Sequence, residues 1–171
     1  MTERFRISET RSTIAFEASG SLHPIHGEAG GLTGLVEAAV TDGRFDLATA
    51  PRLRIELPVE RLRSGNPLYD TELRRRVDVR SYPRIAGEAT GVEALAGPGR
   101  YRVRGDLTFH GVTRPVEGEI ELSAPDERTL VIEGEQVFDV RDFGLRPPKM
   151  LMLRVNPEVK VRIHVVAERE P

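Results

Sequence analysis

The sequence of 171 residues contains no cysteine, which excludes disulfides, thiolate metal sites and cysteine nucleophiles. Large aromatic side chains are also scarce, because there is no tryptophan and only six Phe and three Tyr are present. Lysine is nearly absent: Lys149 and Lys160 stand against 23 arginines, a bias that indicates genome composition rather than chemistry. Aliphatic residues, alanine and glycine must therefore make up most of the interior.

Long apolar runs are missing too. No run approaches the roughly 20 residues that a helix needs to cross a bilayer. Residues 1–20 are interrupted by six charged side chains and contain no apolar segment typical of a secretory signal. These features predict a cytoplasmic protein without a transmembrane segment.

No charge of one sign dominates, since 25 Lys and Arg face 27 Asp and Glu, with a formal net charge of −2. A chain of this kind has no general field to hold a polyanion, which argues against a dedicated nucleic-acid or anionic-membrane protein. The length fits a single domain over residues 1–171, large enough for one sizeable core or one lined cavity.

Apolar and polar residues alternate with a period of two, the pattern of strands with one buried and one solvated face. The alternation is clearest at 53–59, 101–109, 116–122 and 159–165, and weaker at 5–16, 32–40, 85–95 and 130–138. Short turn sequences such as Thr41-Asp42-Gly43 and Gly97-Pro98-Gly99 separate these segments. Seven or eight strands joined in this way predict an all-β antiparallel domain, either a closed up-and-down barrel or a two-sheet sandwich.

One segment follows a helical period instead. Tyr69, Leu73 and Val77 are spaced four apart, and Asn66 followed by Pro67 is a favourable helix start. We therefore expect one short helix, packed on the β structure. With so few large side chains to fill it, the barrel alternative predicts an internal cavity.

The order of several motifs resembles the YceI-like family of lipocalin-like, lipid-binding domains. The similarity begins with residues 5–7, 12–16 and 30–34, continues through 64–83, and is most distinctive over residues 101–116. Arg141-Asp142-Phe143-Gly144 is similar to a late motif of that family. The resemblance extends from about residue 5 to residue 165.

This resemblance implies an antiparallel eight-stranded barrel with one short helix packed at it. It also implies a long apolar cavity for a polyisoprenoid, an isoprenoid quinone or another fatty amphiphile, and no catalysis. We therefore expect a non-catalytic carrier that is not an enzyme and needs no cofactor. Its partner would be a long-chain isoprenoid or amphiphilic lipid, and one-sided sheets also permit a homodimer.

The cavity wall is predicted from the apolar alternates. Each buried methylene contributes about 0.8 kcal/mol, so a long chain could be held with few polar contacts. The predicted lining residues are Phe16, Leu35, Leu53, Ile55, Leu57, Leu73, Val77, Val103, Leu107, Phe109, Ile120 and Ile163. The alternative for each of them is a packed core position without a ligand.

Two other interpretations stay open. His23 and His26 lie three apart beside Pro24, and a third ligand brought in by folding would create a metal or haem site. Alternatively, the interior is filled by its own side chains and the domain serves only as an interaction module.

The remaining polar candidates have simpler interpretations. His110 is expected in a hairpin turn with its ring bonded to backbone, and His164 on a solvated strand face. Residues 74–76 form an arginine run that suits a solvated helix end or an anionic head group. Arg141 is expected to pair with Asp142, and residues 147–153 would join a rigid loop to an apolar strand whose methionines fill gaps or meet ligand.

Overall fold

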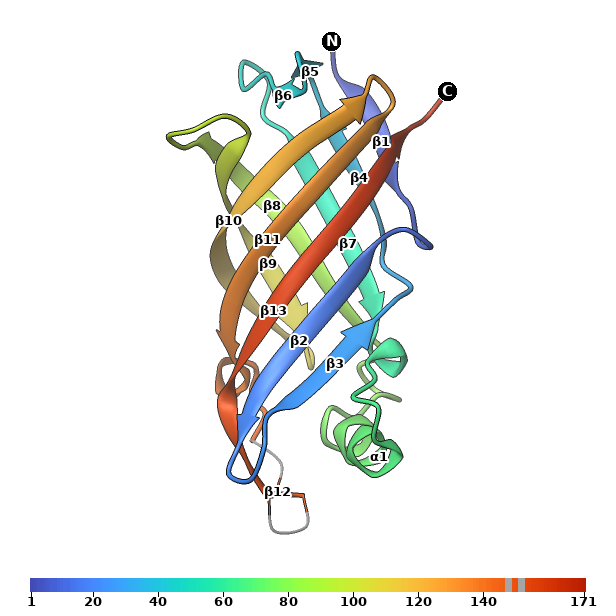
Figure 1. Cartoon of the computed structure of the whole chain (residues 1–171), viewed down its shortest axis with the longest axis vertical. Coiled ribbons are helices and arrows are strands. Elements are labelled where there is room, and N and C mark those ends of the chain that lie inside the picture. Colours follow the sequence, from blue (N-terminus) through green and yellow to red (C-terminus); the bar gives the residue numbers. More distant parts are fainter. Residues whose placement is uncertain (147–148, 151–152) are drawn as a thin grey trace.

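The computed structural model describes residues 1–146, 149–150 and 153–171, and its main feature is a closed antiparallel barrel (Figure 1). Neighbouring strands pair in sequence around the barrel, and β1 pairs with β13 to close it. This confirms the eight-stranded antiparallel barrel. The strands are β1 (Glu3–Ile7), β4 (Thr33–Ala38), β7 (Arg52–Pro58), β8 (Arg84–Ala94), β9 (Arg100–Phe109), β10 (Val112–Asp126), β11 (Thr129–Asp139) and β13 (Leu153–Arg169).

The segment expected as one strand over residues 5–16 is divided into two. After β1, the chain turns outward and returns as β2 (Thr13–Gly20), and both strands pair with β13 at different heights. The break is held by Ser12, which is buried and whose hydroxyl bonds to both the N–H and the C=O of Val166. From β2 the chain forms a hairpin with β3 (Ile25–Ala29), which extends the wall at one end of the barrel.

We call the end of the barrel that carries both chain termini the upper end, as drawn in Figure 1. A small hairpin of β5 (Val40–Thr41) and β6 (Arg44–Phe45) lies there. The Phe45 ring packs on Tyr101 at a centroid distance of 5.1 Å, and the Phe45 N–H donates to the Tyr101 hydroxyl over 3.0 Å. Buried Phe5, Leu122 and Leu130 complete a solid core that closes this end.

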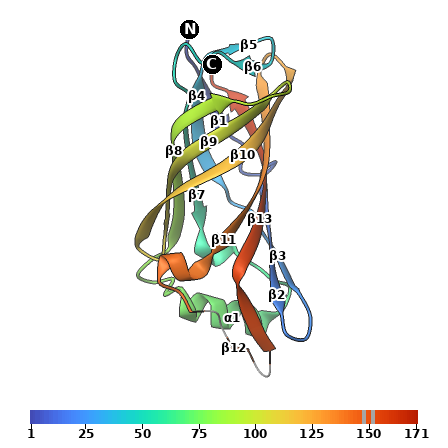
Figure 2. The ribbon, with the colours of Figure 1, turned by 90° about the vertical axis from the view of Figure 1, so that its left-hand side faces the viewer.

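The lower end carries α1 (Pro67–Arg76) and the turn between β2 and β3, with α1 lying across that end in Figure 2. The Asn66 side chain accepts hydrogen bonds from the N–H groups of Leu68 and Tyr69, which confirms the expected helix start. A second apolar cluster forms where α1 ends, and Leu62 and Ile85 pack against both this cluster and the main core. It joins Val77 to residues of the 3-10 helices η1 (Val59–Arg61) and η2 (Val140–Phe143), to Leu145 and to the end of β9. The two-residue strand β12 (Lys149–Met150) pairs with β13 nearby.

The upper closure makes a testable prediction. Tyr101→Phe leaves the buried Phe45 N–H without its acceptor, so we expect the free energy of unfolding in urea to fall by about 1–2 kcal/mol. Tyr82→Phe is the control, because Tyr82 is 38% exposed and lies just before β8, outside the upper core. An equal loss in both variants, or none in Tyr101→Phe, would contradict the role given to this hydrogen bond.

Candidate functional site

On β9, β10 and β11 the inner wall changes from buried to accessible along the barrel axis. At the upper end the inward side chains of Tyr101, Leu122 and Ile132 are at most 4% exposed. Lower on the same strands, Val103 and Leu107 face inward by register and are partly exposed, and inward Gln136 is exposed. We call the interior below Tyr101, Leu122 and Ile132 the lower lumen. Its wall on β9–β11 is accessible, whereas inward Ile14, Ala18 and Leu57 on the β2 and β7 walls are buried.

Glycines at inward positions leave space in the lower lumen. A Cβ at Gly87 would lie between Ile55 and Leu107 of the neighbouring strands, 3.1 Å and 3.8 Å from their side chains. Gly134 is placed in the same way between Ile120 and Ile163. Each of these four aliphatic residues is thus beside a glycine on a neighbouring strand. This arrangement lets the aliphatic side chains lie along the wall and leaves the centre less filled.

The total accessible surface agrees with an incompletely filled interior. The chain exposes 10351 Å². Compact monomers of 19.0 kDa expose about 8,400 Å² by the general scaling of surface with mass. An elongated body and an accessible inner wall both add surface of this kind.

Eleven of the twelve predicted lining residues fall into three groups. Leu57 belongs to the main core, and Leu53, Ile55, Ile120 and Ile163 pack against it. Val77, Leu73 and Phe109 belong to the cluster at the lower end or pack against it. Phe16, Val103 and Leu107 pack in neither cluster of the described residues, although all three face inward and are partly exposed. These three are the best candidates for contact with a ligand. That any of these residues touches a ligand stays a prediction.

Leu35 was predicted on the inner wall, and this prediction is wrong. Val36 pairs with buried Phe5 and faces the core, so Leu35 points to the outside. There it is opposite Arg6 on β1 and Arg54 on β7, both exposed. The reason is that strand residues alternate between faces, and a run of two apolar residues leaves the register ambiguous in sequence.

Phe16 shows how the wall is built on the β2–β3 side. Its ring lies over Gly27 of β3, where any Cβ would overlap the ring. Glycine is therefore required opposite this phenylalanine, and the ring is held against the wall. The other edge of β3 is also bonded, because the backbone groups of Glu28 and Arg63 exchange two hydrogen bonds. This bridge ties the hairpin to the segment before α1.

The two histidines considered as metal ligands point to different neighbours. The His23 ring is 6.3 Å from the Tyr69 ring of α1 and contacts its hydroxyl at 3.5 Å, while His26 Nδ1 is 4.0 Å from a carboxylate oxygen of Glu17. Across the part of the chain that the structure describes, no group of three or more His, Asp or Glu side chains is arranged to hold a metal. A third ligand for His23 and His26 is therefore not found there.

The other histidines lie where they were expected. His110 has a positive φ of 54° in the β9–β10 turn, and its Nδ1 is 3.1 Å from the Phe143 carbonyl. His164 is on the outer face, 2.8 Å from Glu133.

The arginines differ in part from expectation. Arg141 pairs with Asp139 at 2.7 Å instead of with Asp142. In the arginine run, Arg75 and Arg76 pair with Glu72, whereas Arg74 is partly buried and its Nε has no hydrogen-bond partner within the described ranges. The interpretation of Met150 and Met152 concerns side chains outside the described residues.

Two polar residues of the inner wall were missed. Arg114 is opposite inward Leu107, and Gln136 is opposite inward Gly118 and Val161. Extending the inward series Val116, Gly118, Ile120 by one step would have indicated Arg114, since alternation fixes the face of every residue in a strand.

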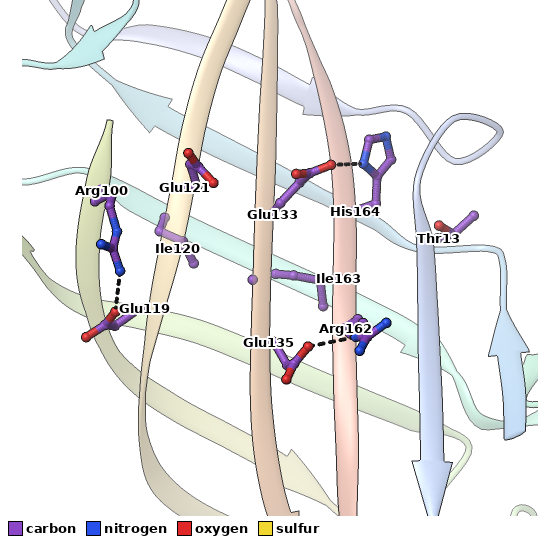
Figure 3. Close-up of a pocket in the computed structure, with 11 residues that line it drawn as sticks. Thr13, Arg100, Glu119, Ile120, Glu121, Glu133, Glu135, Arg162, Ile163 and His164 are labelled. Atoms are coloured by element: carbon purple, nitrogen blue, oxygen red, sulfur yellow. Dashed lines mark hydrogen bonds and ion pairs between the residues drawn. The ribbon is translucent and has the colours of Figure 1, made fainter. Parts of the chain in front are cut away.

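The outer face of β9, β10, β11 and β13 carries a charged pocket of about 490 Å³ (Figure 3). Four Glu side chains surround it, and cross-strand pairs connect three of them to basic residues. Arg100 pairs with Glu119 at 3.0 Å, and Arg162 pairs with Glu135 at 2.7 Å. The third pair is Glu133 with His164. A wall of paired charges suits water rather than an apolar chain, so the lower lumen is the better candidate site.

The fold and the accessible inner wall define a closed up-and-down β-barrel of the lipocalin-like type, with a helix across one end. The chain belongs to the YceI-like domain family, whose sequence model matches residues 5–167. No helix in the described residues has the length and apolarity that a membrane span requires.

Solved structures with the same fold support this assignment. BcnA of Burkholderia cenocepacia is 18% identical, with a TM-score of 0.79 over 94% of this chain and 98% of that one. A polyisoprenoid-binding domain of Saccharophagus degradans is 13% identical, with a TM-score of 0.74 over 97% and 98%. The Campylobacter jejuni YceI protein is 14% identical, with a TM-score of 0.68 over 85% of each chain. The comparison with curated proteins finds no match.

The charged outer wall predicts a loss of stability in acid. The Arg162 guanidinium hydrogen-bonds Glu135 and lowers its pKa from the ordinary 4.5. The pair therefore stabilises the fold above pH 4.5, and this contribution is lost as the pH falls through the lowered pKa. The free energy of unfolding, measured by urea titration, falls between neutral pH and pH values below 4.5. We expect this fall to be smaller in Glu135→Gln than in the unmodified protein. Glu127→Gln, on an exposed turn, is the control, and an identical pH profile in Glu135→Gln and the unmodified protein would contradict the assignment.

Proposed function

We propose that this protein is a non-catalytic carrier that holds a long apolar ligand in the lower lumen. The observation that carries the proposal is the set of inward, partly exposed apolar side chains beneath a solid upper core. Apolar surface that stays accessible inside a folded protein gains free energy when a ligand covers it. A polyisoprenoid, an isoprenoid quinone or a fatty amphiphile has the shape and polarity for this space.

The structural relatives support the same class of ligand. The Saccharophagus degradans domain with this fold is a polyisoprenoid-binding domain. Sequence identity to it is too low to transfer a specific ligand. The shared features are the barrel and its overall dimensions, so the proposal for this chain is the chemical class and not one compound.

The dimensions of the lower lumen limit the ligand. Along β11, the step from Ile132 to Phe138 covers about 20 Å at ~3.3 Å per residue, or about 15 Å of barrel axis at a strand tilt of ~40°. An extended chain advances about 1.2 Å per bond, a third of the span of one extended residue, so about 12 carbons fit in line. A longer chain must fold back or extend through the lower end.

Apolar contacts bind without directing a reaction. Covering 12 methylenes contributes about 10 kcal/mol of transfer free energy, against an association cost of about 4–15 kcal/mol. The ligand must therefore fill the space well to bind tightly. Length and shape, more than individual hydrogen bonds, would set the preference for one chain over another.

Native mass spectrometry of freshly purified protein, followed by organic extraction, tests the function directly. We expect a stoichiometric apolar ligand, or uptake of isoprenoid quinones, polyprenols or fatty amphiphiles by protein that is purified empty. Empty protein that takes up none of these compounds would contradict the proposal.

A paired substitution tests the location. Gly118 faces the lower lumen and Gly91 faces outward opposite exposed Arg104, with open space around the Gly91 Cβ direction. A Cβ at Gly118 would be 3.4 Å from the flexible Gln136 side chain, so leucine can be accommodated. We expect Gly118→Leu to lower the affinity for dodecan-1-ol by more than about tenfold, because its side chain occupies ligand space.

Gly91→Leu should bind dodecan-1-ol as the unmodified protein does, and circular dichroism should show a folded barrel for both variants. Equal affinities in the two leucine variants would place the ligand outside the lower lumen.

A further inference from the structure

Polar side chains on the inner wall of the lower lumen are concentrated on two adjacent strands. Among described residues, the inward positions of β7 to β11 below Tyr101 are apolar or glycine, apart from Arg114 and Gln136. Both side chains are exposed, so their polar groups are accessible to a ligand that enters the lower lumen.

Arg114 lies at the lower rim. It is the third residue of β10, two positions before inward Val116, and it is exposed. Its Nε donates to the carbonyl oxygen of Asp142 in η2 over 2.9 Å. This bond fixes the plane of the guanidinium. Within the described part of the chain that is its one hydrogen bond, so its terminal NH₂ groups are available for an acceptor.

Gln136 lies deeper on the neighbouring strand. It is opposite Gly118 on one side and Val161 on the other, and its carboxamide leans over Gly118, where a Cβ would be 3.4 Å from Oε1. Along β10, Gly118 is four residues above Arg114, about 13 Å at the strand rise of ~3.3 Å. A charged position at the rim and a neutral polar position above it therefore follow one line on the wall.

The charge of the surrounding segment favours an anion. Residues 63–84, which contain α1 and lead into β8 at the lower end, hold six Arg and three Asp or Glu, and one of the six, Arg84, pairs with Glu56 of β7. Another is Arg74, whose buried Nε has no hydrogen-bond partner among the residues that the structure describes. An acidic group at the lower rim would meet a locally positive field.

We propose that the ligand is an anionic amphiphile whose acidic head group, a carboxylate or phosphate, binds Arg114 at the lower rim. Its chain then points toward the closed upper end and passes the Gln136 carboxamide, about 13 Å farther along the wall. This proposal rests on the proposed function, because it concerns the orientation and head group of a ligand in the same lumen.

Isothermal titration of dodecanoate, dodecyl phosphate and dodecan-1-ol tests the proposal, since the three probes share one chain and differ in head group. The unmodified protein should bind at least one anionic probe about tenfold or more tightly than the alcohol. Arg114→Gln should reduce that ratio to near one and leave the alcohol affinity unchanged. Arg104→Gln, the same change on the outer face of β9, should keep the full ratio.

The outcomes separate the two proposals. Binding of the alcohol with no preference for either anionic probe, or an unchanged preference in Arg114→Gln, overturns the head-group assignment and leaves the carrier function standing. If Arg114→Gln weakens the binding of all three probes equally, the residue has a structural role, and the head-group assignment is overturned. Failure of all three probes to bind the unmodified protein counts against the carrier function itself. Inorganic phosphate alone should not compete, and Arg114-dependent competition would identify a free-anion site instead.

Discussion

The volume enclosed by an eight-stranded barrel must be filled by inward side chains or left for a ligand, and this constraint governs the structure. The chain fills the upper end with Phe5, Phe45, Tyr101 and Leu130. Lower down it uses glycine at Gly87, Gly118 and Gly134, so each of the inward aliphatic residues beside them has one cross-strand neighbour without a side chain. The other aromatic residues, Phe16, Tyr69, Tyr82, Phe109, Phe138 and Phe143, lie in the lower half, where Phe109 and Phe143 pack on each other at a centroid distance of 5.9 Å.

The two ends of the barrel therefore have different roles. The upper end is sealed by a small hairpin whose Phe45 bonds to Tyr101, and the termini lie beside it. At the lower end, α1 and the η2 segment contribute to a second apolar cluster, which Leu62 and Ile85 connect to the main core. In the proposed carrier the ligand enters at this end, because inward Val103, Leu107 and Gln136 are accessible there.

Much of this fold could be predicted from sequence because strand alternation was strict where one face meets water. The series Val159, Val161, Ile163 and Val165 is one example, and Asn66 with Pro67 marked the helix start. The break between β1 and β2 could not be predicted, since it depends on the Ser12 hydroxyl replacing backbone bonds to a strand 154 positions away. Leu35 was misplaced because Val36 beside it is also apolar. Arg114 and Gln136 were not predicted because only apolar residues were assigned to inward positions.

The central claim is that a chain occupies the lower lumen with its far end below Tyr101. A crystal structure of the protein with dodecanoic acid brominated at its terminal carbon would locate that end by anomalous scattering. The account predicts a bromine peak inside the barrel, close to Val103, Ile120 and Ile163. A peak on the charged outer wall of β10 and β11 would contradict it. So would the absence of an ordered bromine peak in crystals that, when dissolved, contain one equivalent of the compound by mass spectrometry.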